Sequence, residues 1–356
     1  MAGRAILIAL AVLAYSVRVP AAWVERWYSR GVYARLQPVV TGVSNQVPFA
    51  LLDVLLVVAI VSLVVATVQV CARPWRGRVV REIGRFGLSL VAAGAAVYLV
   101  FWGAWGLNYE RQPLAQRLDL NQDAANHDAL LRLARTIVGQ LNDVHDRAHR
   151  EGFPAWEQMR PSMERTFRAT QTWLAPGTHP RAGAPKWSLL SYYFERAGVS
   201  GMTDPFFLEV LVDRDLLPFE RPFVLAHEWA HLSGYADEAE ANFVGWVTCV
   251  NGAAPAAYSG WLYLYSEAVG ALPREDRVPL VRALAAGPRA DLLAVAERAR
   301  RIQPVLQEVS WRVYDRYLKA NRVGEGIASY DRALVLVLGS RFVNGWTPVL
   351  KTPASR

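Results

Sequence analysis

Two long apolar segments near the amino terminus constrain this chain more than any other feature of its sequence. Residues 47–72 contain a single charged side chain, Asp53, and residues 87–107 contain none. About twenty such residues suffice to cross a lipid bilayer as a helix, and the tryptophans near the end of the second segment are typical of a membrane interface. We therefore predict two transmembrane helices, at about 47–72 and 87–107.

A third apolar segment, residues 5–17, is shorter and is followed by Arg18. It is compatible with a first transmembrane helix at about 5–22, with a signal anchor, or with a cleaved signal peptide. We favour a retained span. The chain is then expected to consist of a membrane anchor with two or three helices, residues 1–107, and a second domain, residues 108–356.

The charge distribution predicts how this anchor is oriented. The chain carries a net charge of +8, but residues 1–107 contain ten Arg and three acidic residues, so nearly all of the excess lies in the anchor. Residues 73–86, between the two long spans, contain five of these Arg, and such basic loops stay in the cytoplasm. We therefore expect a multi-pass protein of the cell membrane with residues 108–356 on the extracytoplasmic side.

Two further consequences follow from the position of the arginines. The basic loop 73–86 lies between two spans, so its expected partners are anionic membrane lipids and not nucleic acid. The segment 18–46 carries four Arg although this topology places it outside. We interpret it as an amphipathic helix that lies at the membrane surface.

Residues 108–356 are predicted to form one mostly helical domain. No further apolar run is long enough to span a bilayer, and the two cysteines of the chain exclude a disulfide scaffold. A loop is expected at 175–187, where Pro and Gly accumulate, and a strand at 206–213, FFLEVLVD. Apolar side chains recur at helical spacing in five segments, which are 123–150, 156–174, 258–271, 275–301 and 302–321.

The chemistry is concentrated in the sequence His227-Glu228-Trp229-Ala230-His231, an HExxH motif. Two His four residues apart lie one turn from each other on the same face of a helix, where their imidazole nitrogens can bind one Zn²⁺. Glu228 can then act as a general base on a water molecule at the metal. The pattern predicts zinc ligands at His227 and His231 and a catalytic carboxylate at Glu228.

A catalytic zinc site needs a third protein ligand, and a second helix follows closely. Gly234 is a natural helix stop, and Asp237 can begin a new helix whose first turns contain Glu238, Glu240 and Asn242. We predict Glu238 as the third ligand, with Asn242 hydrogen-bonded to a ligand from the same face, and Glu240 as the second choice. Alternatively, these acids are a charge cluster that favours the amino-terminal end of the helix.

These motifs resemble known families. HEWAH followed by EAEAN is similar to the gluzincin class of zinc metallopeptidases, although Asn242 stands where the class has Asp. The whole chain also resembles a family of bacterial membrane proteins of unknown function with an HExxH motif, on WGLNYER (105–111), PFFLEV (205–210) and YLKAN…GIASYDR (317–332). The resemblance implies a peptidase with a zincin-like α+β domain that contains a small sheet.

The resemblance to gluzincins also implies two further features. An edge strand runs beside the HExxH helix in that class and pairs with the substrate backbone, so the strand at 206–213 is expected there. Glu209 would then face the cleft, or else lie on the outer surface of the strand. A donor is needed for the oxyanion, and Tyr330 is the first choice, followed by Tyr317 and Tyr314.

Other polar residues in unusual places receive structural interpretations. His145 and His149 form a second HxxxH pair, but their neighbours are polar on every side, so we interpret them as part of a solvated helix face. His127 and His179 lie in similarly polar contexts. Asp53 lies near the end of a predicted span, where its carboxylate can reach the interface.

The expected function is that of a membrane-anchored zinc metallopeptidase with Zn²⁺ on His227, His231 and Glu238. Its substrate would be a peptide or protein at the membrane, or, as a weaker alternative, a nonpeptide amide. A protein of another class remains open, a noncatalytic membrane scaffold or receptor in which a zinc ion ties two helices together.

Overall fold

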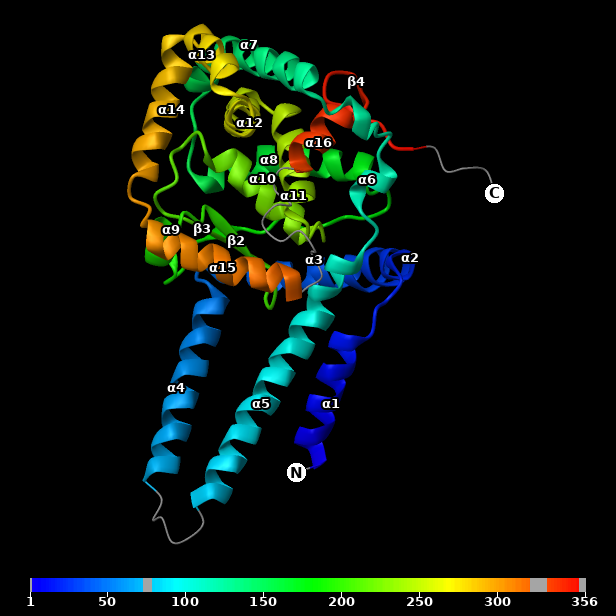
Figure 1. The fold of residues 1–356 in the computed structure, drawn as a ribbon, viewed down its shortest axis with the longest axis vertical. Helices are drawn as coiled ribbons and strands as arrows, with labels where there is room; N and C mark the ends of the chain where they lie inside the picture. Colours follow the sequence, from blue (N-terminus) through cyan, green and yellow to red (C-terminus); the bar gives the residue numbers. More distant parts are fainter. Residues whose placement is uncertain (1, 73–78, 321–331, 352–356) are drawn as a thin grey trace, which may run out of the picture.

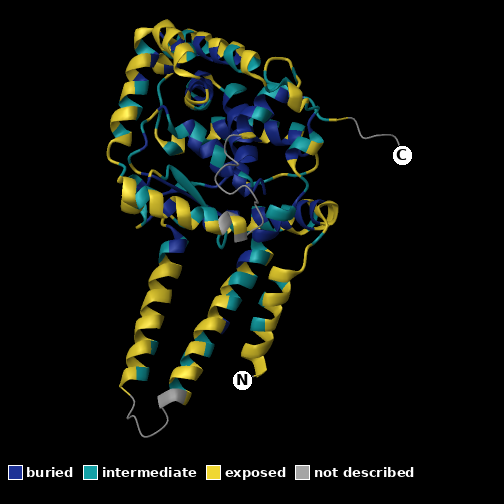
Figure 2. Ribbon diagram, in the orientation of Figure 1, coloured by how far each residue is buried: buried dark blue, intermediate teal, exposed yellow. Residues whose placement is uncertain are grey.

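The computed structural model describes residues 2–72, 79–320 and 332–351 of the chain. Helices α1 (Ala2–Ser16), α4 (Leu51–Cys71) and α5 (Val79–Ala104) project together from one side of a helical domain (Figure 1). Most of their side chains are exposed, whereas the interior of the domain is buried (Figure 2). The anchor and the domain are thus distinct parts of one structure.

Helix α4 and the Arg81–Ala104 part of α5 are long and apolar enough to cross a membrane. They correspond to the helices predicted at 47–72 and 87–107. Helix α5 begins at Val79, so the second half of the basic loop predicted at 73–86 is helical; residues 73–78 lie outside the described part of the chain.

The first apolar segment does not form the single helix predicted at 5–22. Helix α1 ends at Ser16, and the helical run Ala21–Ser44 is bent from it by 109°. Pro20 precedes the second run, and proline cannot donate the backbone hydrogen bond that a continuous helix needs there.

The run after this bend consists of α2 (Ala21–Trp23), the π-helix η1 (Val24–Val32) and α3 (Tyr33–Ser44). It is the segment that we predicted as a surface amphipathic helix. Its exposed side includes Trp23 and Trp27, but Val24, Tyr28 and Tyr33 are buried in a core that they share with residues of α5 and α10 (Arg221–Leu232). This packing joins the run to the main domain.

The main domain is built from helices around a buried centre. Helix α11 (Glu238–Val250) is buried over nearly its whole length and contacts α8, α10, α12 and α16. Trp246 of this helix is fully buried, as are Trp229 of α10 and Trp261 of α12. The surrounding helices not yet delimited are η2 (Gly106–Glu110), α6 (Leu114–Arg117), η3 (Gln122–Ala124), α7 (His127–Glu151), α8 (Trp156–Leu174), α9 (Ser191–Ala197), α12 (Ala254–Gly270), α13 (Arg274–Ala283), α14 (Ala286–Ala299), α15 (Pro304–Ala320) and α16 (Arg332–Gly339).

Most of the predicted helices are present within a few residues of their predicted bounds. The exception is 275–301, which forms two helices, α13 and α14, separated by extended backbone at Leu284 and Ala285. Pro288 lies in the first turn of α14, where its missing N–H group is tolerated, and it cannot continue a helix from α13.

A small sheet lies beside α10, and its strand order differs from the prediction. Strand β3 (Glu209–Val212) is the central strand; β1 (Pro185–Lys186) pairs with it in parallel and β2 (Gly201–Asp204) in antiparallel orientation. The prediction of 206–213 as an edge strand was therefore wrong, because both sides of β3 are paired. The edge strand that contacts α10 is β2. A second sheet pairs β4 (Phe342–Val343) with β5 (Thr347–Pro348).

Polar contacts fasten α4 to this sheet. The Glu209 side chain does not face a cleft: it is fully buried, forms an ion pair with Lys186 at 2.7 Å and accepts a hydrogen bond from the backbone N–H of Leu52. Asp53, in the first turn of α4, accepts hydrogen bonds from the Ser188 hydroxyl and from the backbone N–H of Leu189. The start of the long apolar helix is thus held by buried charge.

Candidate metal centre

The HExxH sequence lies on α10, which packs closely against α11. A Cβ atom at Gly245 of α11 would approach the backbone of His227 to 3.0 Å, so glycine is what permits this contact. The turn between the helices uses Gly234, whose φ of +82° suits glycine. Asp237 caps α11 by accepting a hydrogen bond from the backbone N–H of Glu240, as the sequence predicts.

This arrangement brings together His227, His231 and Glu238. The two Nε2 atoms lie 3.1 Å apart, and Glu238 Oε2 lies 3.4 Å from His227 Nε2 and 3.5 Å from His231 Nε2. Four ligands at about 2.0 Å around a tetrahedral zinc ion are separated by about 3.3 Å, so these spacings match a zinc-binding triad. All three donor atoms lie within 4.8 Å of one another, close enough to bind one metal ion.

The hydrogen bonds of the two imidazoles suit metal binding as well. His231 Nδ1 lies 2.8 Å from the carbonyl oxygen of Tyr235, which accepts the Nδ1 hydrogen, so that Nε2 is the ring nitrogen that faces Glu238. His227 Nδ1 is buried without a hydrogen-bond partner in the described part of the chain. The polar contacts of His227 are made by its Nε2, and its ring packs against Phe223.

The charges in this cluster stabilise one another. Burial lowers the pKa of His231, but the Glu238 carboxylate outweighs it and raises the pKa to about 9. Burial likewise raises the pKa of Glu238, and the two imidazoles outweigh it and hold the pKa well below its usual value. A cation is thus favoured between these three side chains, and a metal ion would displace the proton.

Glu228 lies beside the triad in a confined place. Its carboxylate is buried, and its Oε2 accepts a hydrogen bond from the Thr203 hydroxyl of β2 at 2.8 Å. Burial raises its pKa, while the neighbouring His227 and His231 act in the opposite direction. Gly201 of the same strand leaves room for this carboxylate, since a Cβ atom there would lie 2.6 Å from Glu228 Oε1. Strand β2 therefore positions Glu228.

A cavity of about 1150 Å³ opens onto these residues. His227, Glu228, His231 and Glu238 contribute to its wall. The wall continues to the projecting helices, where it is lined by Tyr15, Val97, Tyr98 and Phe101, and to α15, where it is lined by Trp311, Val313 and Tyr314. The cavity thus connects the candidate metal centre with the ends of α1 and α5.

The other predicted site residues take different places. Asn242 is buried and lines the same cavity. Glu240, the second choice for a ligand, points away from the imidazoles: its Oε1 accepts a hydrogen bond from the backbone N–H of Leu114 at 2.5 Å, and burial raises its pKa to about 7. Helical spacing places Glu238 and Glu240 on different faces of α11. Glu238 therefore faces the two imidazoles, and Glu240 is hydrogen-bonded to the backbone of Leu114.

The three candidate tyrosines differ in what is described. Tyr330, the first choice as oxyanion donor, lies outside the described residues, and so does the side chain of Tyr317. Tyr314 on α15 lines the cavity and donates a hydrogen bond from its hydroxyl to Glu238 Oε1. Sequence reasoning ranked Tyr314 last because nothing in the local pattern shows that α15 crosses over the metal centre.

Sequence reasoning also missed how the end of α10 is held. The Tyr33 hydroxyl donates to the carbonyl oxygen of Leu232, and Arg111 donates to the carbonyl oxygens of Ser233 and Gly234. Arg111 belongs to the WGLNYER segment, which the sequence singled out without a role. These donors satisfy carbonyl groups that have no partner within the helix, and so fix the end that carries His231.

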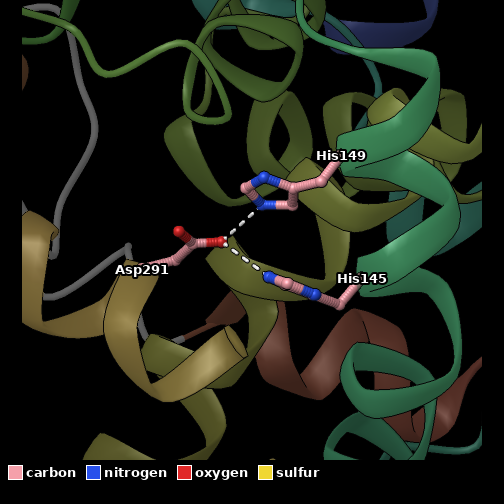
Figure 3. A group of neighbouring side chains, drawn as sticks. All are labelled: His145, His149 and Asp291. Carbon is pink, nitrogen blue, oxygen red and sulfur yellow. Dashed lines mark hydrogen bonds and ion pairs between the residues drawn. The ribbon is translucent and has the colours of Figure 1, made fainter. Parts of the chain in front are cut away.

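The second HxxxH pair, His145 and His149, has a partner that the sequence analysis did not predict. His145 on α7 is half-buried and His149 is exposed, but both rings face Asp291 of α14, a partner that the solvated-face interpretation did not include (Figure 3). His127 is paired with Asp276 at 3.1 Å, and His179 is exposed as expected. The sequence could not show this cluster because Asp291 lies more than 140 residues further along the chain.

Comparisons with known proteins give a family. No curated protein and no solved structure matches the chain. One family matches residues 28–338, from the π-helix η1 to α16, and so covers α4, α5, the HExxH helix and the cavity. The chain therefore belongs to the family described as "Protein of unknown function (DUF3810)".

Proposed function

We propose that this protein is a membrane-anchored zinc metallopeptidase of zincin-like fold, similar to gluzincins. The observation that carries the proposal is the convergence of His227, His231 and Glu238 on one point, with a buried Glu228 beside them and a large cavity in front. Three protein donors and an open side are typical of catalytic zinc sites, whereas structural zinc sites are closed by four protein ligands.

In this proposal His227, His231 and Glu238 hold the metal. A bound zinc ion would supply Lewis acidity that lowers the pKa of water and polarises the substrate carbonyl. Glu228 accepts a proton from the water molecule that adds to the carbonyl carbon. As the carbon–nitrogen bond breaks, Glu228 passes this proton to the leaving amine. The Thr203 hydrogen bond orients Glu228 for both transfers.

Tyr314 takes the role for which Tyr330 was the first choice. Its side chain lines the cavity, and its hydroxyl is hydrogen-bonded to Glu238, one of the three proposed metal ligands. A phenolic hydroxyl has one hydrogen to donate, so in this proposal it turns from Glu238 Oε1 to the oxyanion as negative charge develops. Asn242 on α11 lines the cavity beside these ligands.

The substrate is a peptide or protein segment at the membrane. The cavity wall includes Tyr98 and Phe101 of α5, so its apolar part meets the region where a membrane would begin. Helix α15 lies at the same end of the domain (Figure 1), and Trp311 and Val313 on it are exposed although apolar. Exposed apolar groups beside transmembrane helices favour contact with lipid. The basic segment 73–86 favours an extracytoplasmic position for the domain.

Replacing Glu228 by Gln tests the proposal. Purified full-length protein in lipid vesicles is incubated with a peptide library, and cleavage is followed by mass spectrometry together with zinc content. We expect Glu228→Gln to retain zinc and to lower hydrolysis by roughly 10²–10⁴-fold, the usual contribution of a general base. Glu157→Gln, on an exposed position of α8, is the matched control and should cleave like the unmodified protein.

Two outcomes would overturn the proposal. Protein without stoichiometric zinc, or protein whose zinc content does not fall when both His227 and His231 are replaced by Ala, would contradict the metal site. Zinc-loaded protein whose hydrolysis is unaffected by Glu228→Gln, or that cleaves no peptide, would favour a scaffold in which the metal ties α10 to α11.

A further inference from the structure

Helices α7 and α14 lie at the end of the domain away from the projecting helices (Figure 1), and they carry a second group of side chains that could hold a metal ion. His145 and His149 are one turn apart on α7, and Asp291 faces them from α14 (Figure 3). We infer that His145, His149 and Asp291 form a second site for a divalent transition metal, separate from the HExxH centre.

The donor atoms have the spacing that such a site needs. Asp291 Oδ2 lies 2.8 Å from His149 Nε2 and 3.6 Å from His145 Nε2, and the three donor groups lie within 4.8 Å of one another. Donors around a tetrahedral ion are about 3.3 Å apart, so a small shift of these side chains would accommodate a zinc ion. Two imidazoles and one carboxylate suit zinc and its neighbours in the first transition row.

The contacts around His145 orient it as a ligand. Its Nδ1 lies 2.9 Å from Asp146 Oδ1, and a carboxylate there accepts the Nδ1 hydrogen and leaves the Nε2 lone pair directed at Asp291. A lone pair and a carboxylate oxygen repel each other unless a cation lies between them. Gly287 accommodates the ring, because a Cβ atom there would lie 2.2 Å from it.

Asp291 is also prepared for a ligand role. Its side chain is 12% exposed, and Oδ2 accepts a hydrogen bond from the Tyr258 hydroxyl at 2.6 Å. The side chain of His149 is 38% exposed, so the fourth coordination position is open to water. Asp291 thus has the Tyr258 hydroxyl as a hydrogen-bond donor and two imidazoles as neighbours, and the group is open to solvent at His149. Accessible metal sites have this composition.

The position of the second site indicates its role. Neither these histidines nor Asp291 line the cavity of the HExxH centre. A metal held here would join α7 to α14, and through Tyr258 to α12, which packs against both α7 and α11. The second site therefore stabilises the helices behind the first centre and takes no part in its chemistry.

Zinc titration of full-length protein in detergent tests the inference independently of the proposed function. The first centre is removed by replacing His227 and His231 with Ala, the protein is stripped with chelator, and zinc alone is added. We expect one equivalent to bind and the unfolding temperature to rise. Asp291→Asn in this background should abolish both effects, and His127→Ala, a histidine at the start of the same helix, should abolish neither.

Binding of no zinc by this background would overturn the inference, as would one equivalent that survives Asp291→Asn. If the background fails to fold, His149→Gln in the otherwise unmodified protein gives the answer: bound zinc should fall by one equivalent, and unchanged stoichiometry would refute the second site. If zinc is lost only when His227 and His231 are replaced, the result supports the first centre and refutes the second site.

Discussion

The buried ion pair between Lys186 and Glu209 offers a sharp test of how the anchor is held. The two side chains are 3% and 0% exposed, and the Lys186 ammonium group also donates to the backbone carbonyl and hydroxyl of Ser44 at the end of α3. Glu209 in turn accepts the backbone N–H of Leu52 in α4. The pair therefore joins β1, β3, α3 and the first long apolar helix.

Lys186→Met removes the cation and leaves a buried carboxylate with only weaker partners. Breaking a buried pair in this way costs about 3–5 kcal/mol of unfolding free energy, because the remaining charge has lost its compensation. For a protein of this size 1 kcal/mol shifts the unfolding midpoint by roughly 2–4 °C, so we expect a decrease on the order of 10 °C. Glu209→Gln alone should have a similar effect, since it leaves the ammonium group buried.

The double variant distinguishes charge from packing. Lys186→Met with Glu209→Gln removes both charges, and Gln keeps an oxygen that can accept the hydrogen bond from Leu52. We expect the double variant to lie within about 2 kcal/mol of the unmodified protein, because neutral replacements of buried pairs are often tolerated. Thermal unfolding in detergent, followed by circular dichroism, measures all four proteins.

Single variants that each lower the free energy of unfolding by less than about 1 kcal/mol would refute this reasoning. So would additive effects in the double variant, because a pair that interacts directly cannot give additive losses.

Three further predictions follow from the site. Tyr314→Phe removes the hydroxyl that donates to Glu238, so zinc affinity should fall by about 10–100-fold in a chelator competition. Gly201→Ala places a methyl group 2.6 Å from Glu228 Oε1, and the displaced carboxylate should lower hydrolysis by roughly 10²-fold while zinc content is unchanged. Burial raises the pKa of Asp204 from 3.8 to about 6. The folded state then binds this proton more tightly than the unfolded state, so the contribution of Asp204 is most favourable below pH 3.8 and about 3 kcal/mol is lost as pH rises through 6.

Each of these has a control. Tyr193→Phe removes a hydroxyl that donates to Ser310 and not to Glu238, and this variant should leave zinc affinity unchanged. If Tyr314→Phe binds zinc as tightly as the unmodified protein, the hydroxyl of Tyr314 does not support the metal ligand. Gly139→Ala introduces a methyl group into open space on α7 and should not alter hydrolysis, and a Gly201 variant with full activity would contradict the steric argument. In metal-free protein, the free energy of unfolding of Asp204→Asn should lack the extra decrease between pH 4 and 6. If the free energies of unfolding of both proteins change in parallel with pH, Asp204 makes no such contribution.

Much of the candidate site could be predicted from local sequence patterns, because the positions of its residues depend on one or two turns of helix. The spacing of His227 and His231 places both rings on one face of any helix that contains them. The glycine at 234 and the aspartate at 237 mark the end of α10 and the start of α11, and the structure has both. The separation of Glu238 from Glu240 follows from the same geometry. These features need no information about distant parts of the chain.

Features that depend on distant contacts were not accessible in this way. Glu209 reads as a strand residue that can face a cleft, and its burial with Lys186 depends on β1 and β2 pairing on either side of β3. Tyr314 has no local signal because its importance depends on α15 crossing the cavity. The polar neighbours of His145 conceal its partner, which arrives from α14.

The amino-acid sequence by itself determined the long apolar helices, the predominance of helix and the facing of the HExxH side chains. Each of these follows from hydrophobic length or helical periodicity, which are properties of neighbouring residues. The tertiary structure alone decided that residues 21–44 pack into the main domain, that Arg111 holds the end of α10, and that one cavity joins His227, His231 and Glu238 to α5. These depend on which surfaces bury the most apolar area together, and that is a property of the whole chain.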